Sequence, residues 1–265
     1  VNTIDVVITG NKAFNSGLNG NKNAISITGG GRSGGPGGTN NVVNFVISRN
    51  RVDGATNHGI NVGGGGGNQP DNGGSHQVSG VISRNKVTNV DNRGININGG
   101  RGDFNIVNVD IERNSVKDTG ERGIGVFGGS SGGGNGGANT VHVGTLYRNK
   151  VKNAGLEGIM IARGNASTNN LVSVSEVRRN HVRNSAATGI RLTGSLENTG
   201  TVPVSKNHSD KNGGDGISLG RYDGYVLTKN HANNNAGGGI VAYNNTDGGK
   251  NKAKGNAFCN TPGCY

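Results

Sequence analysis

Apolar residues recur at alternate positions in short runs along this chain, and the runs belong to a longer repeated unit. Each unit contains a basic residue followed by asparagine, and nine residues after the asparagine comes a Gly-Ile-x-apolar segment. The asparagines are Asn50, Asn85, Asn114, Asn149, Asn180, Asn207 and Asn230, and the matching glycines are Gly59, Gly94, Gly123, Gly158, Gly189, Gly216 and Gly239. The steps between successive asparagines vary from 23 to 35 residues. One half of the unit therefore has a fixed length, and the other half contains the insertions.

Three short strands are predicted in each unit, because alternation of apolar and polar residues is the period of a β-strand. Around Asn149, for example, one apolar run ends at Leu146, a second begins at Val151 and a third contains Ile159 and Ile161. No hairpin turn separates the runs, so each unit predicts one coil of a parallel β-helix, in which stacked coils share a core. The shortest unit would have a perimeter of roughly 75 Å, which favours the right-handed form.

The pattern apolar-x-x-Asn-x-apolar followed by Gly-Ile-x-apolar extends from about Ile8 to Gly255. It resembles the right-handed parallel β-helix repeats of the pectate-lyase-like superfamily. The resemblance implies an all-β, single-stranded right-handed parallel β-helix of about nine coils. It also implies that the asparagines stack inward as a ladder and satisfy backbone groups of neighbouring coils. Gly10 and Gly255 stand where the other repeats have a basic residue, which indicates a positive φ at that position.

The composition agrees with one domain. Only 30% of the residues are hydrophobic and 4% aromatic, which suffices for a solenoid whose core is one coil wide. We expect a single β-helix domain over residues 1–265, with repeats to about residue 255 and a C-terminal clip over 256–265. No run of 18 apolar residues occurs, so no membrane insertion is expected.

The two cysteines lie close together at the C-terminal end. A Pro-Gly turn between Cys259 and Cys264 predicts a disulfide, and hence a secreted or extracellular protein, with the periplasm as another oxidising location. Two reduced thiols are the alternative. Because the sequence starts at Val1 within a strand-like segment, we also expect that a signal peptide or propeptide has been removed.

Glycine-rich insertions follow several of the Gly-Ile strands, at residues 30–38, 63–74 and 128–137. They are predicted to project from one edge of the rod. Insertions on one face of a repeat protein often mark its binding side, and low-complexity decoration without a function is the alternative.

Charge is the second informative property of the sequence. With 27 Lys and Arg against 16 Asp and Glu, the net charge is +11, which indicates an anionic partner. The repeat predicts two basic files, one residue before and one after each ladder asparagine. The first file is Arg49, Arg84, Arg113, Arg148, Arg179, Lys206 and Lys229, and the second is Arg51, Lys86, Ser115, Lys150, His181, His208 and His231. Such a double row would bind a linear acidic polysaccharide; the alternative is that it covers a tight turn and keeps the rod soluble.

Nucleic acid is not expected, since the chain has five Phe, five Tyr and no Trp for base stacking.

Candidate catalytic residues come from the file that directly precedes the repeat glycines. Enzymes of the resembling superfamily include polysaccharide lyases, uronate epimerases and glycoside hydrolases, whose chemistry lies on an outer strand face. A lyase or epimerase needs a base for the proton next to the uronate carboxylate and a cation for the developing charge. Arg93, Arg122 and Glu157 are the predicted catalytic residues. The predicted substrate-binding residues are His58, Asn61, Asn96, Arg191, Arg84, Arg113, Arg148 and Arg179. Solvated turn residues without a catalytic role are the alternative.

Glycoside hydrolysis and metal binding have less support. A hydrolase needs two carboxyl groups about 5 to 9.5 Å apart, and Glu157 and Asp215 would lie roughly two coils apart. No cofactor and no metal site is predicted, and calcium stays open without a clear site.

Two classes of function follow. The first is a secreted β-helix that binds an acidic polysaccharide along a basic outer face, with cleavage or epimerisation of that polysaccharide as an open extension. The second is a non-catalytic structural subunit of an extracellular fibre, sheath or adhesin that assembles end to end.

Overall fold

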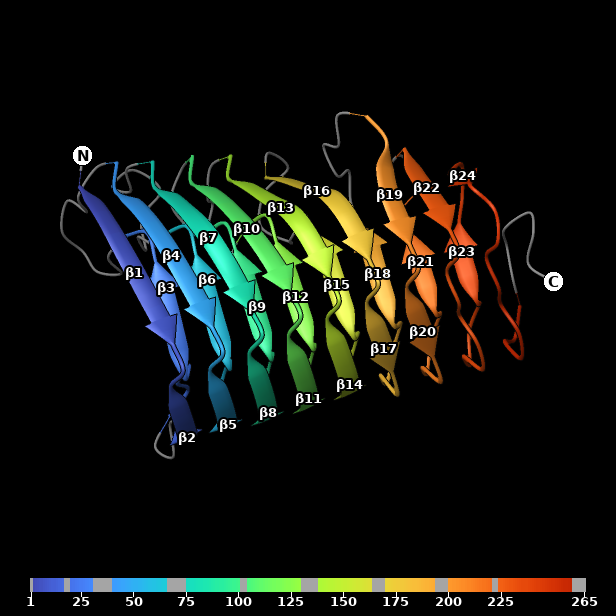
Figure 1. Ribbon diagram of the computed structural model, residues 1–265, viewed down its shortest axis with the longest axis horizontal. Coiled ribbons are helices and arrows are strands. Elements are labelled where there is room, and N and C mark those ends of the chain that lie inside the picture. The colour runs from blue at the N-terminus through green and yellow to red at the C-terminus, as the bar shows by residue number, and fades with distance from the viewer. Residues whose placement is uncertain are drawn as a thin grey trace.

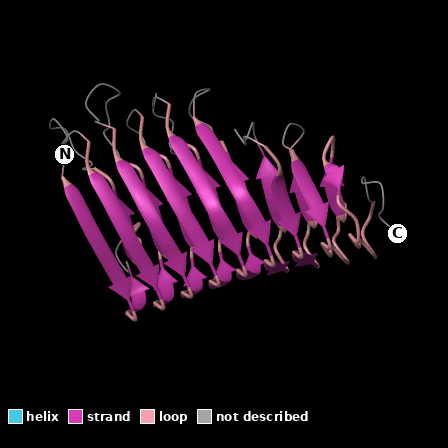
Figure 2. Cartoon of the chain, turned by 45° about the horizontal axis from the view of Figure 1, so that its top comes forward, coloured by secondary structure: helices cyan, strands magenta, loops and turns pink. Residues whose placement is uncertain are grey.

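The computed structural model describes residues 2–16, 20–30, 40–65, 75–100, 104–129, 138–163, 170–193, 200–220 and 224–258. These residues form a rod of stacked coils, with β1 (Thr3–Thr9) at one end and β24 (Thr246–Asp247) at the other (Figure 1). Strands and loops, and no helix, make up the described part of the rod (Figure 2), so it contains no helix that could cross a membrane. The predicted all-β parallel β-helix is confirmed.

Three parallel sheets run along the rod, and we name them A, B and C. Sheet A has nine strands: β1, β4 (Val42–Ser48), β7 (Gln77–Ser83), β10 (Ile106–Glu112), β13 (Thr140–Tyr147), β16 (Leu171–Arg178), β19 (Val202–Ser205), β22 (Tyr225–Thr228) and β24. Sheet B has seven: β2 (Lys12–Ser16), β5 (Arg51–Ala55), β8 (Lys86–Val90), β11 (Ser115–Thr119), β14 (Lys150–Ala154), β17 (His181–Arg183) and β20 (His208–Asp210). Sheet C has eight: β3 (Ile25–Thr28), β6 (Ile60–Gly63), β9 (Ile95–Asn98), β12 (Ile124–Phe127), β15 (Ile159–Ala162), β18 (Ile190–Thr193), β21 (Ile217–Leu219) and β23 (Ile240–Ala242).

The chain passes from sheet A to B to C and then back to A one coil further along. Where strands are absent near the C-terminal end, isolated bridges continue the stack, such as His208 with His231 and Gly238 with Phe258. The glycine-rich insertions connect sheet C to sheet A, but residues 31–39, 66–74 and 130–137 lie outside the described residues. The predicted Cys259–Cys264 disulfide also lies outside them.

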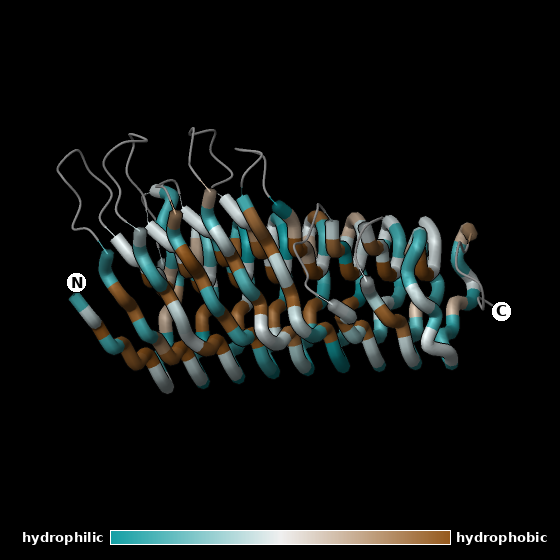
Figure 3. Tube along the Cα trace, turned by 90° about the horizontal axis from the view of Figure 1, so that it is seen from above, coloured by the Kyte–Doolittle hydropathy of each residue, from teal (hydrophilic) through white to brown (hydrophobic). Residues whose placement is uncertain are grey.

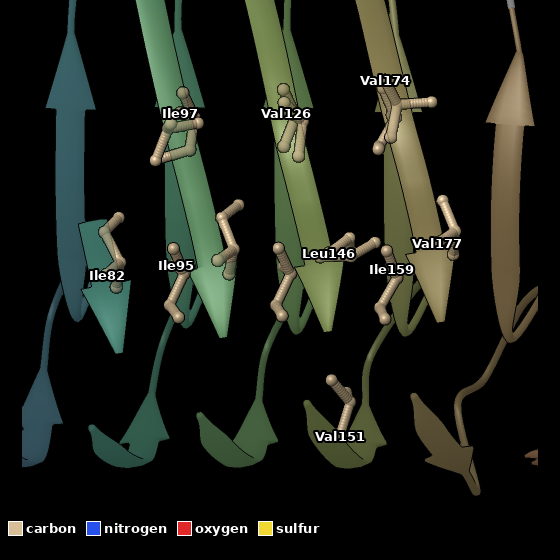
Figure 4. Close-up of a cluster of buried hydrophobic side chains, with 14 of the residues drawn as sticks. Ile82, Ile95, Ile97, Val126, Leu146, Val151, Ile159, Val174 and Val177 are labelled. Carbon is tan, nitrogen blue, oxygen red and sulfur yellow. The ribbon is translucent and has the colours of Figure 1, made fainter. Parts of the chain in front are cut away.

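The core is a column of aliphatic side chains inside the coils. Polar and apolar residues alternate along the strands (Figure 3), and the inward ones stack on their equivalents in the next coil. Ile95 and Val126 of sheet C, Leu146 of sheet A and Val151 of sheet B face one interior (Figure 4). Because Ile95, Ile124 and Ile159 pair in register and are completely buried, the repeated isoleucine is a core position of sheet C.

The repeat glycines are required by close packing. A Cβ on Gly123 would lie 2.2 Å from Cγ1 of Val151 and 2.7 Å from the carbonyl oxygen of Gly158. Gly59, Gly94 and Gly158 meet a valine of the next coil in the same way. None of these four glycines has a positive φ, so the constraint is space and not backbone conformation.

The predicted asparagine ladder is present at the turn from sheet A to sheet B. The side-chain amide of Asn149 donates to Oδ1 of Asn180 at 3.0 Å and to the carbonyl oxygen of Ile111 at 2.8 Å. Its own Oδ1 accepts from the backbone N–H and the amide of Asn114 at 3.0 and 3.1 Å. The same bonds join Asn11, Asn50, Asn85, Asn114, Asn149, Asn180, Asn207, Asn230 and Asn251. Every buried amide in the middle of the ladder is therefore fully used.

The prediction for the C-terminal end of this ladder was wrong in one respect. Asn256 belongs to a second ladder with Asn212 and Asn235, whereas the first ladder ends at Asn251. Gly255 does have a positive φ of 67°, but it aligns with Asn234 of the second turn. The residue that precedes the last member of the first ladder is Lys250, at φ 62°.

Positive φ is confirmed for the basic file itself. Gly10 has φ 70°, and the seven Arg and Lys residues of the first file have φ between 53° and 57°. Each non-glycine residue in this left-handed conformation costs of order 1 kcal/mol. The ladder hydrogen bonds offset that cost, and the left-handed turn leaves the basic side chains exposed outside the coil.

Candidate functional site

The two basic files meet in a groove where sheet A strands pass into sheet B strands. This basic groove has a volume of about 840 Å³. It is lined by Arg113, Asn114, Ser115, Arg148, Lys150, Arg179, His181, Lys206, His208 and Lys229. Of the predicted binding residues, Arg113, Arg148 and Arg179 line the groove, and Arg84 lies one coil before it in the same file.

Backbone register fixes both files. The left-handed residue before each ladder asparagine sets the first file, and the first residue of each sheet B strand sets the second. Ser115 pairs with Lys150, and Lys150 pairs with His181, in consecutive parallel strands. Adjacent members therefore follow the spacing of the coils, about 4.8 Å.

The groove is strongly positive. Of the ten described residues that line it, six are Arg or Lys, two are His, and none is acidic. Within the described ranges, none of these six cations forms an ion pair with a carboxylate. Tyr147 supports two of them, since the guanidinium of Arg113 lies 5.8 Å and that of Arg148 5.1 Å from its ring centre. Charge without a partner in the described chain is the property expected of a site for an external anion.

The predicted catalytic residues form a separate cluster on the outer face of sheet C. Nε of Arg122 lies 2.9 Å from Oε2 of Glu157, and Nη1 of Arg191 lies 3.2 Å from Oε1 of the same carboxylate. Nε of Arg93 lies 3.1 Å from Oε2 of Glu121. The structure thus brings Arg93, Arg122, Glu157 and Arg191 together in consecutive coils, and we call this group with Glu121 the ion cluster.

Two members of this neighbourhood were missed as functional candidates from the sequence. Glu121 directly precedes Arg122, so it lies one position outside the file of residues that precede the repeat glycines, although the sequence shows an acidic residue next to a basic one there. The ring of Phe127 lies under two guanidinium groups, at 4.7 Å from Arg93 and 5.5 Å from Arg122. Cation–π contacts of this kind hold the arginines in place.

Internal pairing dominates the ion cluster. Both carboxylate oxygens of Glu157 are bonded, and this residue is only 6% exposed. Arg93 is also buried and donates to Oδ1 of Asn96 at 2.8 Å, while Asn96 donates to Oδ1 of Asn61 at 2.7 Å. Burial lowers the pKa of the Arg93 guanidinium, and Glu121 opposes that shift. The catalytic roles stay predictions, and a reaction here would require one of these pairs to open.

His58 and Asp215 lie outside the ion pairs. Burial, together with the charge of Arg93, lowers the pKa of His58 from 6.5 to about 4, so its imidazole is neutral near pH 7. The carboxylate of Asp215 accepts the backbone N–H of Gly238 at 2.7 Å. No group of His, Cys, Asp and Glu in the described part of the chain could hold a metal ion.

Comparison with known proteins places the fold. Residues 132–265, just over half of the chain, match a family model described as a right-handed β-helix region. This segment contains the last five strands of sheet A.

No curated protein matches the chain. A crystal structure of the Dettilon tailspike protein (gp208) aligns with 91% of this chain at 13% identity and a TM-score of 0.31. The alignment spans 60% of that tailspike chain, and so low a similarity supports no functional argument. From the family match and the three parallel sheets, we conclude that the chain belongs to the right-handed β-helix family.

Proposed function

We propose that this protein binds a linear acidic polysaccharide along the basic groove. The observation that carries the proposal is the set of six exposed Arg and Lys residues, from successive coils, that line one groove without a carboxylate partner in the described chain. The net charge of +11 adds a long-range attraction for any polyanion.

The spacing of the charges favours a linear chain that lies parallel to the rod. Each coil adds one residue of each file, so a polymer along the groove would meet new cations about every 4.8 Å. Along one strand of duplex DNA the phosphates advance about 3.4 Å each along the helix axis and wind around it, so they do not keep register with a straight row of cations. The described residues that line the groove include no Phe, Tyr or Trp on which bases could stack. An acidic polysaccharide fits both features.

The backbone under the groove is well suited to hold such a site. The ladder asparagines Asn114, Asn149 and Asn180 are buried directly behind the first file. The positions of the cations are therefore fixed by strand register, while their long side chains adapt to the ligand.

We further propose an extracellular setting, in line with the disulfide expected at Cys259 and Cys264.

Charge reversal in the groove tests the proposal. The triple variant Arg113→Glu, Arg148→Glu and Arg179→Glu is expected to elute in the wash from a heparin or polyuronate column that retains the unchanged protein at low salt. The three side chains are exposed, so circular dichroism should show an intact fold. Binding dominated by ion contacts should also weaken steeply with salt in the unchanged protein.

A matched control comes from the same three coils. Lys117, Lys152 and Arg183 pair in register two residues further along sheet B and do not line the groove. Each reversal to Glu lowers the net charge by two units, so the net charge of both triple variants falls from +11 to +5. The control variant is expected to stay on the column. If the two variants are retained equally, the groove cations have no special role in binding and only cover the turn, which would overturn the proposal.

A further inference from the structure

Three histidines occupy successive positions in the second basic file. His181 and His208 line the C-terminal end of the basic groove, and His231 follows in the next coil. His181 pairs with His208 in neighbouring strands, and His208 forms a bridge with His231 in the next coil. The ring centres lie 5.9 Å apart for the first pair and 4.6 Å apart for the second. Elsewhere the same file carries permanent charges, at Lys86, Lys150 and Lys252. The three histidines therefore form a segment of the file between the permanent charges of Lys150 and Lys252.

The surroundings of the histidines are mostly cationic. The charges of Lys150 and Arg183 lower the pKa of His181, and the charge of Lys252 lowers the pKa of His231. The cations of the first file at this end of the groove are Arg179, Lys206 and Lys229. Asp210 is the opposing acid, and its carboxylate also accepts the backbone N–H of Asn233 at 2.9 Å. Burial lowers the pKa of His181 and of His231, and the charge of His208 lowers both further.

We propose that the file His181, His208 and His231 makes the basic groove a pH-dependent site, which takes up protons when a polyanion binds and therefore binds more tightly at acidic pH. This inference rests on the proposed function, because it concerns the same groove and ligand. Its basis in the structure is the juxtaposition of three imidazoles in register beside a row of cations that form no ion pair with a carboxylate of the described residues.

The sign follows from linkage. In the free protein the pKa values of His181 and His231 lie below 6.5, so these rings are neutral near pH 7 and add no charge. A bound polyanion stabilises the imidazolium form and raises each pKa. Between the lower free value and the higher bound value, the affinity rises as the pH falls, and it levels off below the free value. Each histidine contributes a factor of about ten for every unit by which binding raises its pKa.

The test measures the dissociation constant for heparin by calorimetry at pH 7.5 and pH 5.0, at one ionic strength. Heparin is the probe because its sulfate esters stay ionised over this range. The unchanged protein is expected to bind at least about tenfold more tightly at pH 5.0, the effect of a single histidine whose pKa rises by one unit. The salt dependence of the affinity should also be steeper at pH 5.0, since more cations contact the ligand.

Two triple variants separate charge from other effects of pH. His181→Gln, His208→Gln and His231→Gln should bind with the weaker affinity at both pH values. His181→Lys, His208→Lys and His231→Lys should bind with the tighter affinity at both, as Lys already occupies this file at Lys150. His142→Gln, on sheet A, is the control and should keep the pH dependence of the unchanged protein.

The outcomes distinguish this inference from the one on which it rests. If the unchanged protein does not bind heparin at either pH, both the proposed function and the inference fail. Binding that is equal at the two pH values would overturn the histidine inference alone. The same is true if the glutamine variant keeps the full pH dependence.

Discussion

Replacement of Asn149 by leucine is expected to lower the free energy of unfolding by about 3 kcal/mol or more, because it leaves several buried polar groups without partners. Leucine has nearly the shape of asparagine but offers no donor or acceptor. The backbone N–H and the side-chain amide of Asn114 would lose their acceptor, and the carbonyl oxygen of Ile111 would lose its donor. Asn149 is completely buried, so water cannot replace these bonds. Thermal unfolding followed by circular dichroism measures the effect.

The ends of the ladders provide the comparison. Asn11 is exposed and belongs to the first coil, and Asn256 is only partly buried at the end of the second ladder. Leucine at either position is expected to lower the melting temperature much less than leucine at Asn149. Similar losses at all three sites would contradict the view that the buried ladder stabilises the middle of the rod.

Replacement of Gly123 by alanine is the second change with a large expected effect. The new methyl group would lie 2.2 Å from Cγ1 of Val151 and 2.7 Å from the carbonyl oxygen of Gly158, so the coils would have to move apart. Overpacking of this kind costs about 1 to 3 kcal/mol. The loss should appear as a lower midpoint of denaturant unfolding.

A double variant shows whether the valine is the cause. Val151→Ala removes the atom nearest to the new methyl group, so Gly123→Ala should be less harmful in that background than in the unchanged protein. Gly10→Ala is the control, because nothing lies within 4 Å of its Cβ position and only its φ of 70° opposes the change. Strict additivity of Gly123→Ala and Val151→Ala would contradict the packing explanation.

Most of the fold could be predicted from the repeat. A constant Asn-to-Gly span fixes the register of sheets A, B and C, so it also fixes the ladder and the left-handed basic file. The second ladder was missed because it exists only in the last coils, at Asn212, Asn235 and Asn256. Its signal was present, since each member follows a first-ladder asparagine by five residues. A third row, Asn105, Asn139 and Asn170, was also missed. Its members follow segments of variable length, and they precede the next ladder asparagine by nine residues at Asn105 and by ten at Asn139 and Asn170, where β13 and β16 are one residue longer than β10.

The candidate sites could be predicted less completely. Strand register alone placed Arg113, Arg148 and Arg179 in one row, so the basic files could be predicted from the sequence, whereas the groove that they line could not. Arg122, Glu157 and Arg191 were also placed on one face, but their pairing depends on the directions of long side chains, which the repeat does not specify. For the same reason the sequence did not show that Glu157 would be buried between two guanidinium groups.

The dissociation constant for sulfated oligosaccharides of increasing length tests the central claim most directly. The groove extends from Arg113 to Lys229 over five coils, a distance of about 20 Å at the usual strand spacing. Calorimetry at low salt should show an affinity that rises with oligosaccharide length until the ligand spans this distance and then levels off. An affinity that does not depend on length, or the absence of binding at low salt, would contradict a linear polyanion site along the rod.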